Sequence, residues 1–152
     1  MPTVEPLDLL HLGHRVLAAQ PFSLLIGATL EAFSPGMAVL RIPIREELLQ
    51  QNGFVHGGVL SYAADNVLTF AGGTVLGPGV LTSGYKINYL RPAVGESLIA
   101  RGTVVHAGRR QAVCRCDVFA VDGQGNETLC ATAQGTIVAT GAGPEVREGG
   151  PS

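Results

Sequence analysis

The sequence has 152 residues, 46% of them hydrophobic, and a formal net charge of −2, which predicts one domain with a substantial core. No apolar run approaches the ~20 residues that cross a bilayer, neither end carries the basic and then apolar pattern of a secretory signal, and the arginines form no extended basic face. We therefore expect a cytoplasmic protein with neither a membrane nor a nucleic acid as its partner.

The N-terminal third predicts one amphipathic helix and a pair of strands. In chain order, the expected elements are a helix over 6–19, a strand over 22–33, a turn over 34–36, a strand over 37–43, a short helix over 45–51 and a turn at 52–53. Pro21 is expected to end the first helix, and Gly27 is expected to form a bulge in the first strand. The alternating Ala38, Leu40 and Ile42 define one face of the second strand.

Residues 52–73, NGFVHGGVLSYAADNVLTFAGG, are the most informative stretch of the chain. Apolar residues recur there at helical spacing, which predicts one buried or half-buried helix that begins at the His-Gly-Gly of 56–58. The Gly72 and Gly73 pair is a natural C-terminal stop, so we expect the helix to end there.

One carboxylate, Asp65, interrupts the apolar surface of this helix, with Ser61 and Thr69 one turn away on the same stripe. A charged side chain is costly to bury without partners. Asp65 is therefore either a functional group or an interface or buried carboxylate that those two hydroxyls hold.

The start of the same helix offers a second chemical group. Backbone N–H groups at a helix start are unpaired and stabilise a developing oxyanion, which favours Gly57 as a donor. Asp65 lies roughly 12 Å further along the axis, so one chain cannot bring both groups to one carbonyl. Two copies of the helix that run antiparallel across a two-fold axis would do so, which indicates a homodimer with shared sites.

The second half of the chain predicts four strands. They are expected to cover 80–90, 96–107, 111–122 and 128–139. Their short connections favour antiparallel neighbours, so the element order fits an antiparallel sheet around one central helix. We expect a single domain over 1–140, with 1–21 as an N-terminal helix and lead-in, and a disordered Gly/Pro/Glu-rich tail over 141–152.

The His-Gly-Gly of 56–58 with Asp65, followed by the Tyr-Leu-Arg-Pro of 89–92, resembles the motifs of hotdog-fold acyl-CoA thioesterases of the phenylacetic-acid-pathway (PaaI-like) type. About three quarters of the chain, residues 22–138, take part in this resemblance. It implies an α+β hotdog fold, in which an antiparallel sheet wraps around a long central helix. It also implies a thioesterase without a cofactor that acts on an acyl-CoA as a homodimer or a dimer of dimers.

The resemblance also implies roles for particular residues. Asp65 of one subunit is expected to attack the thioester carbonyl or deprotonate water, while Gly57 of the other polarises that carbonyl. The family's carboxamide, six residues before the histidine, corresponds to Gln50; a slip of one or two residues would place it at Gln51 or Asn52. The remaining expected catalytic residues are His56, which either contacts the substrate or braces the loop, and Thr69 and Thr82, one of which holds the carboxylate.

Coenzyme A carries a diphosphate and a 3′-phosphate, so a site for it requires cations. The residues expected near the CoA moiety are Gly58, Lys86, Arg91, Arg109 and Arg110. The alternative for each cation is an ordinary solvated charge. The acyl group is expected to be aryl or of medium length.

Other chemistries have weaker support in the sequence. No G-x-S-x-G, H-E-x-x-H or C-x-x-C motif occurs, so we expect neither an α/β-hydrolase mechanism nor a metal. Cys114, Cys116 and Cys130 are expected as reduced thiols in the core. Two alternative functions are a hotdog β-hydroxyacyl thioester dehydratase or hydratase, which needs a histidine and a carboxylate in a single site, and a non-catalytic acyl-CoA binding module.

Overall fold

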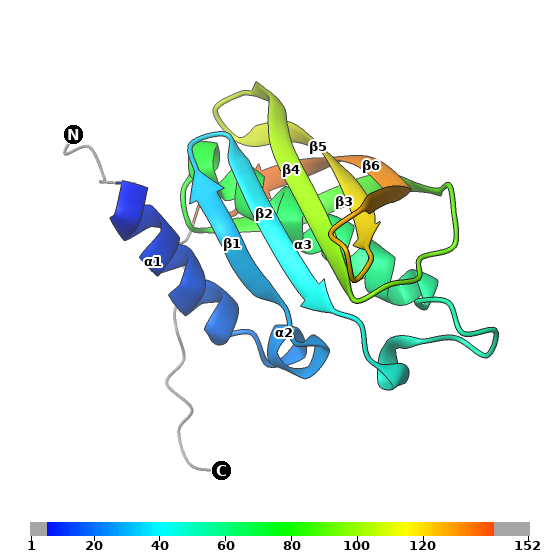
Figure 1. Ribbon diagram of the computed structural model, residues 1–152. Coiled ribbons are helices and arrows are strands. Elements are labelled where there is room, and N and C mark those ends of the chain that lie inside the picture. Colours follow the sequence, from blue (N-terminus) through cyan, green and yellow to red (C-terminus); the bar gives the residue numbers. More distant parts are fainter. Residues whose placement is uncertain (1–5, 142–152) are drawn as a thin grey trace, which may run out of the picture.

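The computed structural model describes residues 6–141, and a six-stranded antiparallel sheet wraps around its longest helix (Figure 1). The elements in chain order are α1 (Pro6–Ala18), α2 (Pro21–Ile26), β1 (Thr29–Ser34), β2 (Met37–Pro43), the 3₁₀ helix η1 (Glu46–Leu48), α3 (Gly57–Leu76), β3 (Val80–Tyr89), β4 (Ser97–Ala107), β5 (Gln111–Val121) and β6 (Glu127–Ala139). The strands lie in the order β1-β2-β4-β5-β6-β3, and every neighbouring pair is antiparallel. This is the predicted α+β hotdog arrangement. Of the tail predicted over 141–152, only Gly141 lies within the described residues.

The core lies between α3 and the inner face of the sheet. The buried residues of α3 recur at intervals of three and four and include several small ones: Val59, Leu60, Ala63, Ala64, Val67, Leu68, Phe70, Ala71 and Gly72. Small side chains let the helix approach the strands closely. At Gly102 of β4, an added Cβ would lie 3.0 Å from the Val67 carbonyl oxygen. The sheet supplies alternating side chains to the same core. Ala38, Leu40 and Ile42, predicted to share one face of their strand, are each at most 1% exposed, so that face is the inner one.

Residues 21–26 form the helix α2, so the strand predicted over 22–33 is wrong in its first half. Proline is favoured in the first turn of a helix because its missing N–H would be unpaired there anyway, and Pro21 occupies that position. The helix ends at Gly27, whose φ of 85° and N–H bond to the Ser23 carbonyl form a left-handed C-cap. The bulge predicted at Gly27 is therefore also wrong.

Strand β1 begins at Thr29, and its register shift lies between Leu30 and Ala32. The two buried residues of α2, Ser23 and Ile26, stand three positions apart. A helix of six residues shows that spacing only once, so periodicity could not distinguish it from a strand.

Helix α3 continues past the Gly72 and Gly73 pair, so the predicted end of the helix is wrong. It ends at Leu76, where Gly77 has a φ of 96°. Gly72 serves close packing instead, because a Cβ at that position would lie 2.7–2.8 Å from three atoms of the buried Ile137 side chain. A glycine that permits close approach and a glycine that ends a helix look alike in a single sequence.

The three cysteines lie in the core, as predicted: Cys114, Cys116 and Cys130 are free and buried. Burial raises the pKa of Cys114 to about 11 and that of Cys116 to about 12. Both thiols are therefore protonated, and poor nucleophiles, at neutral pH.

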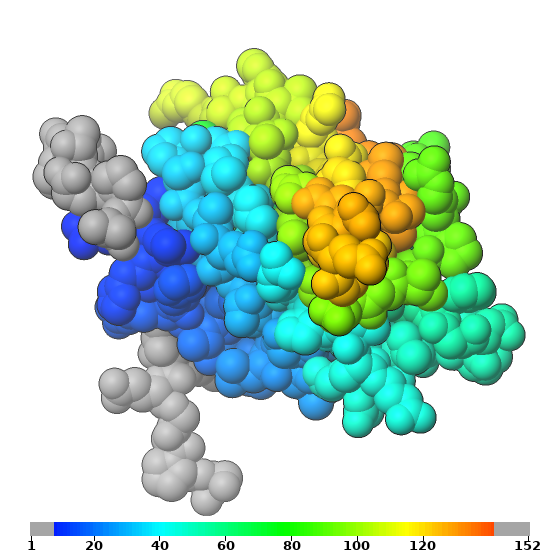
Figure 2. Space-filling model, in the orientation of Figure 1, coloured from blue at the N-terminus to red at the C-terminus, as the bar shows by residue number. Residues whose placement is uncertain are grey.

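Helix α1 covers the β1 edge of the sheet (Figures 1 and 2). Its His14 Nε2 lies 2.8 Å from the Leu30 carbonyl oxygen, and Gly13 lets the helix approach Leu30 and Phe33 closely. No described helix combines the length and the hydropathy that a bilayer-spanning segment requires.

The two glycines of α3 provide a matched test of this packing. We expect Gly72→Ala to lower the free energy of unfolding by roughly 1–3 kcal/mol, because the new methyl group overlaps Ile137. Gly73→Ala should raise it by about 0.5–1 kcal/mol, because alanine favours the helix and its Cβ would meet only Val80, at 3.6 Å. Urea denaturation measures both values, and effects of the same sign would contradict the packing described here.

Candidate active site

The first turn of α3 begins at His56, which is the N-cap. Its Nδ1 atom accepts a hydrogen bond of 2.8 Å from the Gly58 N–H, and its carbonyl accepts one of 2.9 Å from Val59. Among the described residues, none accepts a hydrogen bond from the Gly57 N–H. The imidazole thus braces the turn, and Gly57 retains the unpaired donor of the helix start.

Gly57 opens onto a surface pocket of about 290 Å³, which Gln50 and Arg91 also line. The Tyr89 hydroxyl, at the end of β3, donates a 3.2 Å hydrogen bond to the Gly57 carbonyl and so connects the helix start to the sheet. Of the three candidate carboxamides, Gln50 is the one that lines this pocket. Its Oε1 accepts a hydrogen bond from the Asn52 N–H, which leaves the side-chain NH₂ group to donate.

The Asp65 carboxylate lies two turns further along α3 and is bonded to β3. Thr82 donates a 2.7 Å hydrogen bond to Asp65 Oδ1. The Thr69 hydroxyl lies 2.8 Å from Thr82 Oγ1 and 2.9 Å from the Asp65 backbone carbonyl oxygen. Thr82 has one hydroxyl proton and donates it to the carboxylate, so in its contact with Thr69 it can only accept. Thr69 donates to the Asp65 backbone carbonyl, and its one proton can be shared with Thr82 Oγ1. Thr82 therefore contacts the carboxylate directly, and Thr69 acts through Thr82.

Ser61, which the sequence offered as a second holder of the carboxylate, has a different partner. Its hydroxyl is hydrogen-bonded to the Tyr85 hydroxyl of β3. The hydroxyl of Tyr62, the next residue, lies 2.5 Å from the Ser23 hydroxyl of α2 and accepts a 2.9 Å hydrogen bond from the Asn66 side-chain NH₂. Burial raises the pKa of Tyr62. Neither Tyr62 nor Tyr85 was predicted from the sequence, although the i, i+4 spacing of Tyr62 and Asn66 puts both side chains on one stripe of the helix.

The structure confirms that Gly57 and Asp65 lie apart within one chain. Both belong to the uninterrupted helix α3, and eight residues of α helix span about 12 Å. Gly57 and Gln50 line one pocket, whereas Asp65, Thr69 and Thr82 form a separate polar cluster.

The residues predicted near CoA lie in three different places. Arg91 lines the Gly57 pocket and donates a 3.1 Å hydrogen bond to the Leu129 carbonyl. Arg109 and Arg110 form the turn between β4 and β5; Arg110 accepts a hydrogen bond from Ala139, the residue that pairs with the first residue of β3. The Gly58 N–H is already bonded to His56.

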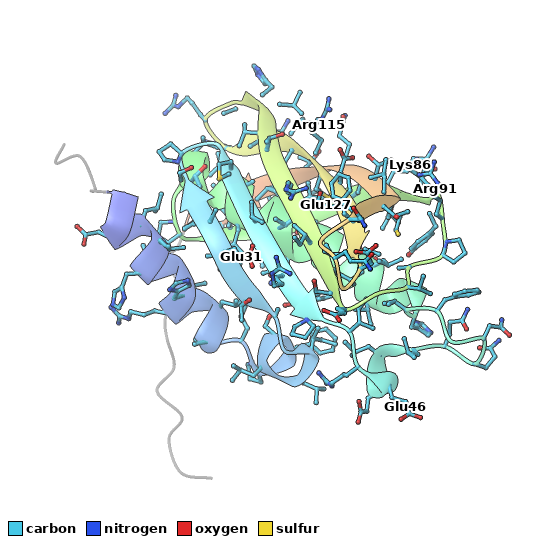
Figure 3. The ribbon with its side chains drawn as sticks, viewed as in Figure 1. Glu31, Glu46, Lys86, Arg91, Arg115 and Glu127 are labelled. Carbon is cyan, nitrogen blue, oxygen red and sulfur yellow. The ribbon has the colours of Figure 1, made fainter. Side chains whose placement is uncertain are left out.

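Lys86 lies on the outer face of the sheet, away from α3 (Figure 3). It lines a second surface pocket, of about 340 Å³, with Asn88, Arg115 and Gln134. Strand alternation explains this position, because Tyr85 and Tyr89 contact α3 and the even-numbered residues between them point the other way. Within one chain, the sheet separates Lys86 from Asp65.

A six-stranded antiparallel sheet wrapped around one long helix is the hotdog fold of thioesterases. Residues 52–126 match the Thioesterase superfamily, and the chain belongs to this superfamily. Membership of this superfamily makes the protein a thioester hydrolase.

Relatives support the same assignment. A protein of Saccharolobus solfataricus that is an esterase by name is 35% identical over 115 residues, which are 74% of this chain and 73% of that protein. The crystal structure of a thioesterase family protein from Silicibacter pomeroyi superimposes with a TM-score of 0.78 at 33% identity, over 82% of this chain and 93% of that chain. A variant of the phenylacetic acid degradation protein PaaI from Thermus thermophilus gives a TM-score of 0.69 at 28% identity, over 79% of this chain and 99% of that chain.

The two threonines near Asp65 should contribute unequally. We expect Thr82→Val to lower thioester turnover about 10- to 100-fold, the range for losing a hydrogen bond to a charged group. Thr69→Val should have a smaller effect, because Thr69 reaches the carboxylate only through Thr82. Thr82→Ser keeps the hydroxyl and is the control. A larger loss in Thr69→Val than in Thr82→Val would show that the roles are reversed.

Proposed function

We propose that this protein hydrolyses acyl-CoA thioesters to a free acid and CoA, at sites that two subunits share. The observation that carries the proposal is the placement of two groups on α3. An unpaired N–H lies at Gly57, and a carboxylate oriented by Thr82 lies at Asp65. Each supplies one of the two requirements of thioester hydrolysis, carbonyl polarisation and activation of the attacking group.

The sheet supports a two-fold dimer. Strand β3 is at one end of the strand order, so one of its edges has no neighbouring strand among the described residues. Antiparallel pairing of two β3 strands would place the two α3 helices side by side and antiparallel, with Asp65 facing the partner's Gly57. It would also bring the turn of Arg109 and Arg110, which lies near the start of β3, toward the partner's Arg91, which follows the end of β3 in that subunit.

The proposed chemistry follows from these positions. The thioester oxygen accepts a hydrogen bond from the Gly57 N–H, at the positive end of the α3 dipole, and the Gln50 NH₂ group lies in the same pocket. The Asp65 carboxylate takes a proton from water as the water oxygen attacks the carbonyl carbon, or attacks that carbon itself. When water attacks, the C–S bond then breaks, and the CoA thiolate takes the proton that Asp65 holds. When Asp65 attacks, the C–S bond breaks to leave an acyl–Asp65 anhydride, and water hydrolyses this anhydride to the free acid and the Asp65 carboxyl group, which gives its proton to the CoA thiolate.

The dehydratase alternative has less support. It requires a histidine and a carboxylate in a single site, but the His56 Nδ1 atom is occupied by the Gly58 N–H at the helix start. Among residues 6–141, no histidine forms a hydrogen bond or ion pair with Asp65. The binding-module alternative predicts acyl-CoA binding without turnover.

Free CoA release from a panel of acyl-CoAs tests the proposal. We expect turnover by the wild type and a loss of at least ~100-fold in Asp65→Asn, the scale expected for a base or nucleophile. Asp117→Asn is the matched control, because Asp117 is bonded to Thr132 on β6 and has no contact with Asp65. Binding without turnover in the wild type would favour the binding module, and unchanged turnover in Asp65→Asn would remove Asp65 from the mechanism.

Mixed dimers test whether the site is shared. Gly57→Pro removes the N–H at a helix position that tolerates proline, and the extended ψ of 136° at His56 suits a residue before proline. Gly57→Pro and Asp65→Asn should each be inactive alone. Co-expressed, they should regain roughly a quarter of wild-type turnover, because half of the dimers are mixed and each mixed dimer keeps one intact site. Gly57→Ala, which keeps the N–H, is the control, and no recovery in the mixture would mean that each site lies within one chain.

A further inference from the structure

We propose that the cavity between α1 and α3 binds the acyl group of the substrate and selects acyl groups that are apolar and uncharged. This inference rests on the proposed hydrolysis of an acyl-CoA at Asp65. The cavity has a volume of about 360 Å³, within the range of small-molecule sites. Helix α1, which flanks the sheet in Figure 1, supplies one wall, and the C-terminal half of α3 supplies another.

The walls of the cavity are mainly hydrocarbon. Leu12 and Val16, one turn apart on α1, face it and remain 45% and 41% exposed. Phe33 and Phe70 pack edge to face across its floor, with ring centroids 5.4 Å apart. Large apolar side chains with this much exposed surface would gain from covering by an apolar ligand.

The cavity adjoins the proposed catalytic cluster. Thr69, whose hydroxyl lies 2.8 Å from Thr82 Oγ1, is part of its lining. The α3 residues that line the cavity start at Thr69, one turn beyond Asp65, and the lining continues to Gly77. Eight residues of helix correspond to about 12 Å. An acyl chain whose carbonyl lies at Asp65 can therefore extend along α3 into the cavity.

Several polar atoms of the lining already have partners. Thr74 donates a 2.6 Å hydrogen bond to the Ala71 carbonyl and accepts one of 2.9 Å from the Gly36 N–H. Gln20 Oε1 accepts a 2.6 Å hydrogen bond from Ser23. None of the described lining residues is charged. A carboxylate or hydroxyl on the acyl chain would lose its water here without gaining a charged partner, so dicarboxylic acyl groups are disfavoured.

Substitutions at Val16 test this assignment through the chain-length profile. In Val16→Phe the larger side chain takes up part of the cavity, so kcat/KM for octanoyl-CoA and phenylacetyl-CoA should fall on the order of 10-fold or more. Acetyl-CoA, which does not reach α1, should change less than about twofold. Val105→Phe is the matched control, because Val105 is an exposed valine of β4 outside the cavity.

A second variant separates selectivity from damage to the fold. Val16→Arg places a cation in the wall and should raise the ratio of adipyl-CoA to octanoyl-CoA turnover at least ~10-fold. A misfolded protein would lose both activities together. The acyl-cavity assignment would be overturned if acetyl-CoA hydrolysis stays normal while two ratios stay unchanged. These are the octanoyl-CoA to acetyl-CoA ratio in Val16→Phe and the adipyl-CoA to octanoyl-CoA ratio in Val16→Arg. That outcome would leave the proposed function intact.

A binding measurement makes the test independent of turnover. S-octyl-CoA, a thioether that cannot be hydrolysed, should bind the wild type on the order of 10-fold more tightly than S-ethyl-CoA, and Val16→Phe should abolish that difference. Isothermal titration calorimetry measures both affinities. If no acyl-CoA is hydrolysed, the proposed function fails, but tighter binding of S-octyl-CoA than of S-ethyl-CoA would still support the cavity assignment. Equal affinities of the two thioethers for the wild type would overturn the cavity assignment.

Discussion

The close contact between α3 and the sheet is the constraint on which the rest of this structure depends. Glycines and alanines at the contact, such as Ala64 and Gly72, let the helix lie near β4, β5 and β6, and the Cys116 thiol lies within 3.9 Å of the Ala64 carbonyl oxygen. A tightly packed helix has a fixed rotation about its axis. That rotation turns Ser61, Asp65 and Thr69 toward β3, where Tyr85 and Thr82 bind the first two.

The rigidity of the same helix separates the two chemical groups of the site. An α helix holds its N-terminal N–H groups and a side chain eight residues later at a fixed spacing of about 12 Å. Neither bending nor a rotamer change can close that distance. The edge of β3 that no described strand covers offers another way to bring the two groups together. Pairing of two such edges across a two-fold axis would align opposite ends of two α3 helices. In the proposed function, a two-fold dimer would therefore be part of the catalytic design and not only a source of stability.

The two proposed recognition regions differ in chemistry because they lie at opposite ends of α3. Near Gly57, Gln50 and Arg91 supply polar and charged groups suited to a thioester and a phosphate-bearing thiol. Beyond Asp65, Leu12, Val16 and other hydrocarbon side chains line the cavity. A substrate with one polar and one apolar end fits this polarity.

Much of the architecture was predictable from local pattern. Strand alternation located the hairpin after Ser34 and the four strands after Val80, and the motif at 56–58 located the start of α3 and the Gly57 donor. Six residues were too few for α2 to show a period, and Gly72 looked like a helix end because its contact, Ile137, is distant in sequence.

The sequence by itself determined which residues could act: a lone carboxylate on an apolar helix, a glycine at the helix start, and hydroxyls near the carboxylate. Only the tertiary structure decided their partners. Thr82 rather than Ser61 bonds Asp65, Gln50 rather than Asn52 lines the Gly57 pocket, and Lys86 lies on the far face of the sheet. The physical reason is that helical and strand periods are local properties, whereas hydrogen-bond partners depend on the register between α3 and β3, which packing of the whole core sets.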